Sequence, residues 1–445
     1  MKKKIALTPI QILAIGFGLI ILVGGILLSL PICNNNGKCT PFINGLFTAT
    51  SSTCVTGLSV YDIYSQYNLF GQFIILVLIQ VGGLGFIAVA MIFSSLLGSK
   101  ITLRQKTLIA ESIGATKYNG LILTIKRMFC GTVLIEGIGA IIIASRLMSD
   151  LGFKQATWFG IFHSVSAFCN AGFDLFGKFA PGSSIITKNN DLYIEFTVMF
   201  LIVSGGIGFI VWNDMAKYKF NFKKYPLHSK IMLTFTAALI LVGAIFFYML
   251  EHNNAFSEMT LSEKITNSLF ASVTPRTAGF ASVDYSNMSA ASRGLTMILM
   301  LIGAGPGSTG GGMKVTTIIV VILGIQASVL NYNDYSIFRR RIPDSVKVRA
   351  FSNAGAYMSL LFLTIFLLLI LNPSVSFEAI MYEAISALGT VGLTLGLTPG
   401  LSVTSKILLI SLMYLGRLGS LSIAMAVARK KFIPKISYPE ENITV

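Results

Sequence analysis

Long runs without a charged residue constrain this chain more than any other feature. Residues 5–37, 63–99 and 350–377 contain no Asp, Glu, Lys or Arg. A transmembrane helix needs about 20 mostly apolar residues, and each of these runs is long enough to supply one. Charged residues make up only 12% of the 445 residues, against about 25% in soluble domains. The sequence therefore predicts an all-α polytopic membrane protein.

Basic residues concentrate in segments that alternate with the apolar runs. Five segments, 2–4, 100–127, 217–230, 339–349 and 429–435, hold 23 of the 34 Lys and Arg residues. Basic loops next to membrane spans mark the cytoplasmic side, so both termini are expected in the cytoplasm. The formal charge of +16 then reflects topology, and we expect no nucleic-acid partner.

The opposite loops are acidic, with 11 of the 18 Asp and Glu residues. Such loops could raise the local cation concentration, although ordinary solvated loops explain them equally well. Cys33 and Cys39 share one outer loop and could pair, but a single couple is no disulfide framework. No Cys/His cluster has metal-ligand spacing, and neither H-E-x-x-H nor G-x-S-x-G occurs. We expect no metal site, no catalytic residues and no enzyme activity.

A repeated motif lies in the outer loops, each of which contains an apolar stretch too short to span a membrane. The four copies are FINGLFTATSSTCVTGL (42–58), TWFGIFHSVSAFCNAGF (157–173), KITNSLFASVTPRTAGF (264–280) and FEAIMYEAISALGTVGL (377–393). Aligned on Gly57, Gly172, Gly279 and Gly392, they place Ser51, Ser166, Val273 and Ser386 six residues upstream. Four copies at near-constant spacing predict an internal fourfold repeat.

Two spans flank each copy of the motif. The expected first spans are 10–30, 121–147, 229–250 and 350–371, and the expected second spans are 71–97, 192–216, 295–330 and 403–429. The predicted architecture is four covalently linked helix–pore loop–helix repeats, with eight spans and four re-entrant pore helices around a pseudo-fourfold axis. The expected units are residues 1–98, 119–217, 228–331, which has a broken second span, and 348–431, with a cytoplasmic tail at 432–445.

Non-helical backbone at membrane depth must be buried in protein or line a water-filled cavity. Four re-entrant loops around one axis would supply such a cavity, and rings of backbone carbonyls can replace an ion's hydration shell. The short helices would direct their partly negative C-terminal ends inwards, which favours a cation.

The segments TCVTGL, FCNAGF, TPRTAGF and LGTVGL resemble four divergent copies of the potassium-channel filter T-V-G-Y-G. A four-repeat chain of this kind resembles the Trk/Ktr/HKT superfamily of potassium transporters, and its length resembles that of the Ktr membrane subunit, KtrB. The resemblance implies a K⁺-translocating subunit of the cell (plasma) membrane. The implied K⁺ selectivity filter consists of Val55, Thr56, Gly57, Asn170, Ala171, Gly172, Thr277, Ala278, Gly279, Thr390, Val391 and Gly392.

The stretch GAGPGSTGGGMK (303–314) contains a G-x-G-x-x-G pattern typical of dinucleotide-binding sites. However, VTTIIVVILGIQASVL follows it and is apolar on every face, whereas a nucleotide fold needs an amphipathic βαβ unit. A continuous helix over 295–330 would also be about 54 Å long, against a hydrocarbon core of ~30 Å. We therefore expect a break here instead of a nucleotide site.

The broken stretch resembles the superfamily's intramembrane gating loop. The expected gate comprises Gly303, Gly305, Pro306, Gly307, Ser308, Thr309, Gly310, Gly311, Gly312, Lys314 and Arg417. Arg417 has no acidic candidate in its own span, so we expect its guanidinium to bind carbonyl oxygens of the loop. Glu136, an acid within an apolar run, is either a functional group or a paired structural one. Arg276 could pair with an outer acid in a structural role.

The resemblance also implies partners. They are a second copy of this chain in the bilayer and a cytosolic RCK/KTN-type regulatory ring that carries ATP or ADP, with Na⁺ as an activator. No cofactor is expected in this chain. A secondary K⁺ symporter coupled to Na⁺ or H⁺ would also use broken helices at mid-membrane, so it stays open as an alternative.

Overall fold

The computed structural model describes residues 8–85, 121–219, 221–331 and 336–419. Within them the chain is mostly helical, with one two-stranded hairpin. The α-helices are α1 (Pro9–Ser29), α2 (Phe42–Thr53), α3 (Ile63–Gln66), α4 (Leu69–Leu84), α7 (Leu121–Phe168), α8 (Leu192–Gly206), α9 (Phe209–Tyr218), α10 (Leu227–Glu251), α11 (Leu261–Val273), α12 (Ala290–Leu301), α13 (Val315–Val329), α14 (Asp344–Leu371), α15 (Phe377–Gly389) and α16 (Val403–Leu418). The hairpin pairs β1 (Ser336–Ile337) with β2 (Arg340–Arg341), and short 3₁₀ turns lie at Pro31–Cys33, Phe176–Lys178, Ser184–Lys188, Phe222–Lys224, Tyr285–Asn287 and Thr398–Gly400.

Four described helices are long and apolar enough to cross a membrane: Gln11–Ser29, Ile125–Phe168, Leu227–Glu251 and Asp344–Leu371. At most 33% of the most apolar stretch of each is buried, and apolar side chains such as Leu19, Ile141 and Phe366 are exposed on their outer faces. Such surfaces suit lipid. The chain is therefore a multi-pass membrane protein, as the sequence predicted.

The helices start where the sequence supplies caps. Thr8 forms a capping box with Gln11 ahead of α1, and Thr260 forms one with Glu263 ahead of α11. Each side chain satisfies a backbone N–H that has no partner within the helix. Asn68, Asp191 and the serines 376 and 402 do the same for α4, α8, α15 and α16.

One expected second span is interrupted at a place where no break was predicted. The helix expected over 192–216 is broken: α8 ends at Gly206 and α9 leaves it at an angle of 95°. The chain also leaves helical structure between Leu301 and Val315. Residues 86–97 and 420–429, expected to complete the spans that begin as α4 and α16, lie outside the described residues, as do the basic segments at 2–4 and 429–435 and the tail at 432–445.

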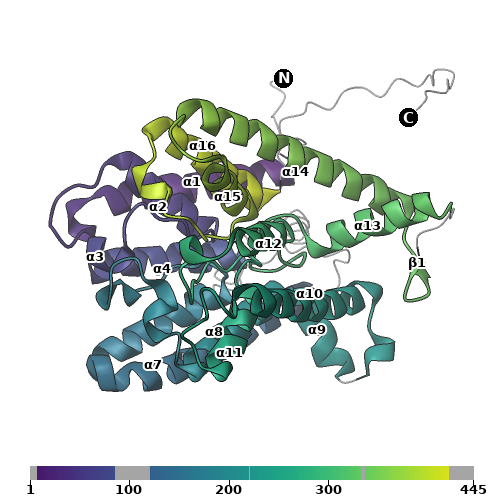
Figure 1. Ribbon diagram of the computed structural model, residues 1–445, viewed down its shortest axis with the longest axis horizontal. Coiled ribbons are helices and arrows are strands. Elements are labelled where there is room, and N and C mark those ends of the chain that lie inside the picture. The colour runs from purple at the N-terminus through teal and green to yellow at the C-terminus, as the bar shows by residue number, and fades with distance from the viewer. Residues whose placement is uncertain (1–7, 86–120, 220, 332–335, 420–445) are drawn as a thin grey trace, which may run out of the picture.

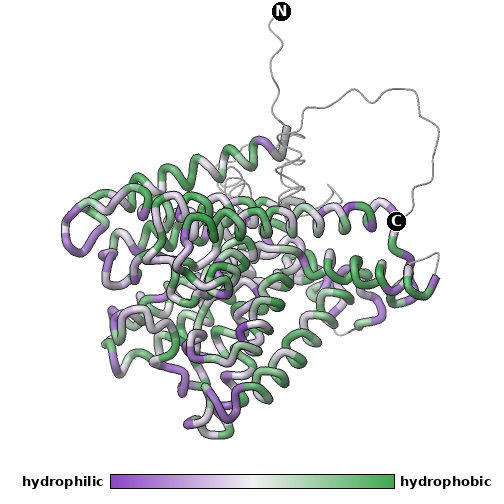
Figure 2. Tube along the Cα trace, turned by 45° about the horizontal axis from the view of Figure 1, so that its top comes forward, coloured by the Kyte–Doolittle hydropathy of each residue, from purple (hydrophilic) through white to green (hydrophobic). Residues whose placement is uncertain are grey.

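The first and last described helices lie in the same half of the molecule. In Figure 1, α1 and α2 lie beside α15 and α16, whereas α7 to α11 occupy the other half of the molecule. Hydrophobic residues follow the long helices and hydrophilic ones gather in the connecting loops (Figure 2). Two large buried clusters form the core, one around α4, α7 and α8 and one around α12, α14, α15 and α16. Both surround the short helices.

Candidate functional site

Four short helical segments end in unusual backbone. They are α2, α11, α15 and the part of α7 that follows the non-helical Gly152. The four residues that end at each aligned glycine form what we call the return segments, 54–57, 169–172, 276–279 and 389–392. In each of them φ is positive at the glycine and also two residues before it, at Val55, Asn170, Thr277 and Thr390. A left-handed conformation costs a non-glycine residue about 1–2 kcal/mol, and such strain clusters at functional sites.

The four aligned glycines, which we call the ring glycines, contact one another in a closed order. A Cβ atom added at any one of them would collide with the carbonyl oxygen that precedes the next ring glycine. The pairs are Gly57 with Ala171 (2.7 Å), Gly172 with Ala278 (2.6 Å), Gly279 with Val391, and Gly392 with Thr56. The last pair joins the end of the chain to its beginning. Only glycine permits this approach. The close contacts in the ring therefore explain why a glycine recurs at this position of all four motifs.

Side-chain hydroxyls hold the return segments. Ser51 accepts a hydrogen bond from the amide of Gly57 and Ser386 accepts one from that of Gly392, both at 3.0 Å. Ser166 accepts one from Phe173, one residue further along. These are the serines that alignment places six residues before each ring glycine. The third copy has a valine there, and Thr274 substitutes by donating to the carbonyl oxygen of Phe280 (2.6 Å).

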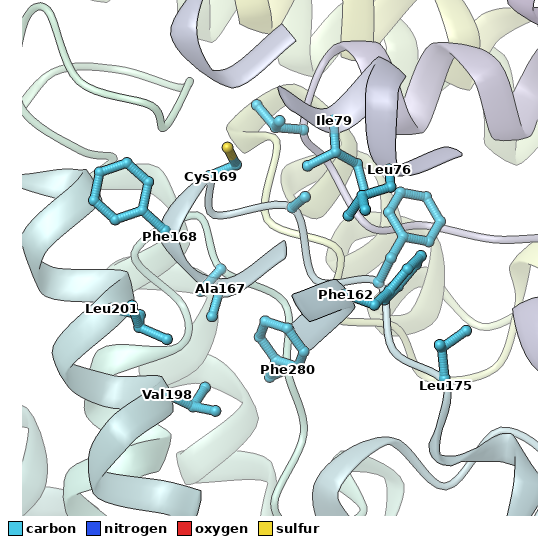
Figure 3. Packing of buried hydrophobic residues seen from close by; sticks show 14 of the residues in the cluster. Leu76, Ile79, Phe162, Ala167, Phe168, Cys169, Leu175, Val198, Leu201 and Phe280 are labelled. Carbon is cyan, nitrogen blue, oxygen red and sulfur yellow. The ribbon is translucent and has the colours of Figure 1, made fainter. Parts of the chain in front are cut away.

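Glycines of the second helices pack beneath the short helices. Gly82 of α4, Gly205 of α8 and Gly416 of α16 each lie so close to a carbonyl oxygen that a Cβ would clash. Those oxygens belong to Thr53, Phe168 and Leu388, each four residues before a ring glycine. Three residues later, Gly85, Gly208 and Gly419 have positive φ and end the regular helix. Figure 3 shows the buried side chains around Phe168, where residues of α4, α7 and α8 meet.

Residues 302–314, which we call the central loop, lie among these elements. The Gly305 amide donates to Gly206 (2.9 Å) and the Gly307 carbonyl accepts from Phe209 (2.9 Å). Thr309 donates from its hydroxyl to the Phe168 carbonyl at the end of a short helix (3.0 Å). Side chains at Gly310 and Gly311 would strike the hydroxyls of two return segments, those of Thr277 and Thr390. The loop therefore contacts three return segments or the helices that lead into them.

Arg417 and Lys314 both bind backbone carbonyls of this loop. Arg417 donates from Nη1 to Thr309 and from Nη2 to Gly82 and Gly83, the latter at 3.1 Å. Its guanidinium therefore ties the loop to the end of α4. Lys314 donates to Gly310 (2.8 Å) and Gly311 (3.2 Å). The structure thus brings together the residues expected to form the gate. Ser308 lies in the same loop, but its buried hydroxyl has no hydrogen-bond partner among the described residues.

A cavity of about 520 Å³ opens above the ring glycines, all four of which line it. Asp62, Asp174 and Asp284 also line it, and no Lys, Arg or His does so in the part of the chain that the structure describes. Burial and the neighbouring carboxylate of Asp62 raise the pKa of Asp174 to about 7. Carboxylates without a basic neighbour raise the local concentration of cations.

The sequence analysis also named Arg276, Glu136, Cys33 and Cys39, and the structure gives the contacts of each. Arg276 donates to the Thr236 hydroxyl (3.2 Å) and forms no ion pair within the described residues, so the pairing with an outer acid that the sequence allowed is not made there. Glu136 accepts from Gln80 (3.2 Å), and the Cys169 thiol lies 3.9 Å from its other oxygen. Cys33 and Cys39 are both free. The roles of the serine hydroxyls and of Gly82, Gly205 and Gly416 were not predicted. The available signals were the constant offset of the serines from the ring glycines and the G-x-x-G pattern that each of the three glycines begins in its second helix.

Comparisons with known proteins agree on one family. The family model described as TrkH, cation transport protein, matches residues 21–437. The potassium/sodium uptake protein NtpJ of Enterococcus hirae is 39% identical over 100% of this chain and 99% of its own length. The Ktr system potassium uptake protein B of Bacillus subtilis is 38% identical over 99% of this chain and 97% of its own length.

Among solved structures, the potassium transporter TrkH from Vibrio parahaemolyticus has the same fold. The TM-score is 0.73, and the match covers 96% of this chain and 86% of that one at 18% identity. Cation transporters of this kind are not enzymes, which agrees with the expectation from the missing catalytic motifs. The chain belongs to the TrkH family of cation transport proteins.

Proposed function

We propose that this chain is the K⁺-translocating membrane subunit of a K⁺ uptake system. Its four repeats, 1–98, 119–217, 228–331 and 348–431, would surround one pore on a pseudo-fourfold axis. The observation that carries the proposal is the closed order of the ring glycines, each against a carbonyl oxygen of the next return segment. Carbonyl oxygens of the twelve filter residues would then replace the hydration shell of K⁺. The names of the relatives support K⁺ as the transported ion.

The central loop is the proposed gate beneath this filter. It would block the path as long as Arg417 and Lys314 hold its carbonyl groups. Its glycines lower the energetic barrier between two backbone arrangements. A gate of this kind needs two states of similar free energy, which a loop held mainly by a few hydrogen bonds can provide.

A passive pore and a coupled symporter differ in one measurement. K⁺ flux into liposomes that contain only this chain should follow the K⁺ gradient, with Na⁺ altering its rate as an activator. A reversal potential that shifts with the Na⁺ or H⁺ gradient would favour the symporter. No flux of K⁺ under any gradient, from protein shown to be folded, would contradict the proposal.

The acidic cavity should make cation uptake depend on external pH. The pKa of Asp174 is raised to about 7, so this carboxyl is neutral below that pH and charged above it. K⁺ flux should rise between about pH 6 and pH 8 as this charge appears, and Asp174→Asn should flatten the profile. Asp284→Asn is the matched control: it should lower flux without moving the midpoint. A midpoint unchanged by Asp174→Asn would remove this assignment.

A K⁺ uptake system of this kind would have further subunits. We propose a homodimer in the cell membrane, with both termini in the cytoplasm on a ring of RCK/KTN-type subunits that carries ATP or ADP. The sorting of basic residues supports this orientation, and the term "Ktr system" supports a multi-component assembly. Purification from detergent should recover a nucleotide-binding protein whose retention changes when ADP replaces ATP. Nucleotide-switched flux by the chain alone would show that no such partner is needed.

A further inference from the structure

The bend between α8 and α9 creates a cavity away from the proposed pore. Gly208 has a φ of 96° and allows the chain to turn, and Trp212 donates from its indole to the Ser204 carbonyl across the bend (3.0 Å). A Cβ at Gly131 of α7 would lie 2.9 Å from the Trp212 ring. The bend therefore seats α9 against the first turns of α7, and a cavity of about 650 Å³ opens between the two helices.

This cavity is apolar inside and positively charged at its rim. Met128, Phe209 and Trp212 supply the apolar lining, and Arg127 and Lys217 supply two cations. Among the described residues, no acid lines it: Asp214 of α9 is buried and accepts a hydrogen bond from the Ser229 hydroxyl. Arg127 is exposed and uses one donor on Asn213 (3.3 Å). A guanidinium has five donors, so others are available to a ligand.

A lipid-facing surface continues from the cavity along α7. Val133 is 52% exposed and Leu134 is 63% exposed, on a helix long and apolar enough to cross the membrane. A ligand that fits has an anionic head group, which Arg127 and Lys217 would bind, and long apolar chains that follow α7. We propose that this cavity binds an anionic phospholipid.

A free anion such as inorganic phosphate shares the head-group chemistry but gains nothing from the apolar lining. The apolar contacts with Phe209 and Trp212 therefore favour the lipid. Basic pockets between helices on the basic side of a membrane protein are suited to acidic head groups.

One described residue that lines the cavity also contacts the central loop. Phe209, which lines the cavity, donates from its amide to the Gly307 carbonyl (2.9 Å). A bound lipid that holds Phe209 in place stabilises the loop arrangement described above. This consequence for K⁺ flux rests on the proposed function, whereas the binding does not.

The chain has only two tryptophans, Trp158 and Trp212, which makes a direct test practical. In a Trp158→Phe background, Trp212 fluorescence is measured in vesicles with increasing fractions of brominated phosphatidylglycerol or brominated phosphatidylcholine. The brominated anionic lipid should quench half of the signal at a mole fraction about tenfold lower than the zwitterionic one. Two basic residues near a head group account for a difference of that order.

Paired variants separate this site from general surface charge. Arg127→Gln/Lys217→Gln should bring the two quenching curves together, while Lys223→Gln/Lys224→Gln, which removes two charges outside the cavity, should leave them apart. Equal quenching by the two lipids, or an unchanged preference in the first pair, would overturn the proposal. Displacement of the lipid by millimolar inorganic phosphate would assign the site to free anions instead.

Flux provides the second measurement. Anionic vesicles should reduce K⁺ flux through the chain alone at least about twofold relative to zwitterionic ones, and Arg127→Gln/Lys217→Gln should remove that difference. Head-group-selective quenching without any effect on flux would keep the site and refute its connection to the central loop. Because quenching is measured without transport, its result stands whether or not the chain conducts K⁺.

Discussion

Substituting serine for Gly392 should cost this protein most of its selective K⁺ uptake. The residue has a φ of 96°, and an added Cβ would lie 2.9 Å from the Cα of Gly57 as well as against the Thr56 carbonyl. Strain of about 1–3 kcal/mol at such a position corresponds to a loss of about 5- to 150-fold in K⁺ affinity. Flux assays with K⁺ and Na⁺ should show weaker K⁺ uptake and a larger proportion of Na⁺. Gly57→Ser and Gly172→Ser should act in the same direction.

Gly396 offers a matched control because it separates backbone strain from crowding. It also has a positive φ (84°) and lines the cavity above the ring glycines, but nothing lies within 4 Å of an added Cβ. Gly396→Ser should therefore leave the preference for K⁺ over Na⁺ unchanged. If the three ring substitutions also leave affinity and discrimination unchanged, the return segments are not the filter.

Deleting Gly305–Gly310 should raise K⁺ flux by about tenfold or more and make it less dependent on the regulatory partner. The deletion removes the backbone bonds to Gly206 and Phe209 and the carbonyl that accepts from Arg417. A closed state favoured by 1.4 kcal/mol is populated about tenfold over the open one, so losing a few hydrogen bonds is enough to shift it. Flux in liposomes with and without the partner measures both effects, after size-exclusion chromatography shows that the variant is folded.

Arg417→Ala should act in the same direction but more weakly, since Lys314 still binds Gly310 and Gly311. Arg417→Lys keeps the positive charge but loses the guanidinium fork that joins Thr309 to Gly82, so its effect should be smaller than that of Arg417→Ala without being absent. Combined with the deletion, Arg417→Ala should add little, since both changes remove the contact between Arg417 and the Thr309 carbonyl. Additive effects, or a folded deletion variant without flux, would mean that the loop supports the pore instead of closing it.

The sequence predicted those features that depend on local pattern. Apolar length identified the membrane helices α1, α10 and α14, and the recurring glycine identified where each return segment stands. The break after Leu301 followed from a stretch too long for one helix. Each inference needed only residues near one another in the chain, together with the thickness of a bilayer.

The bend after Gly206 was missed because distant residues produce it. SGGIGF resembles the stretch VGGLGF that begins in α4, and nothing local in it indicates a turn of 95°. The turn is held by Gly307, about a hundred residues away, and by the fit of Trp212 against Gly131. The exact hydrogen-bond partners of Arg417 were likewise out of reach, because two of them belong to α4 at the opposite end of the sequence.

The contact between Gly392 and the carbonyl of Thr56 has a consequence for biogenesis. During synthesis the first three ring glycines can meet in order, because each neighbour emerges from the ribosome soon after the last. The final contact must wait until more than three hundred residues have been inserted, and a loop of that length is closed late and at an entropic cost. In the proposed re-entrant arrangement, Gly57 and its carbonyl neighbours would until then have an open side toward the bilayer interior, where unsatisfied backbone groups are costly. Completion of the chain's last helices is therefore also the event that stabilises its first short helix.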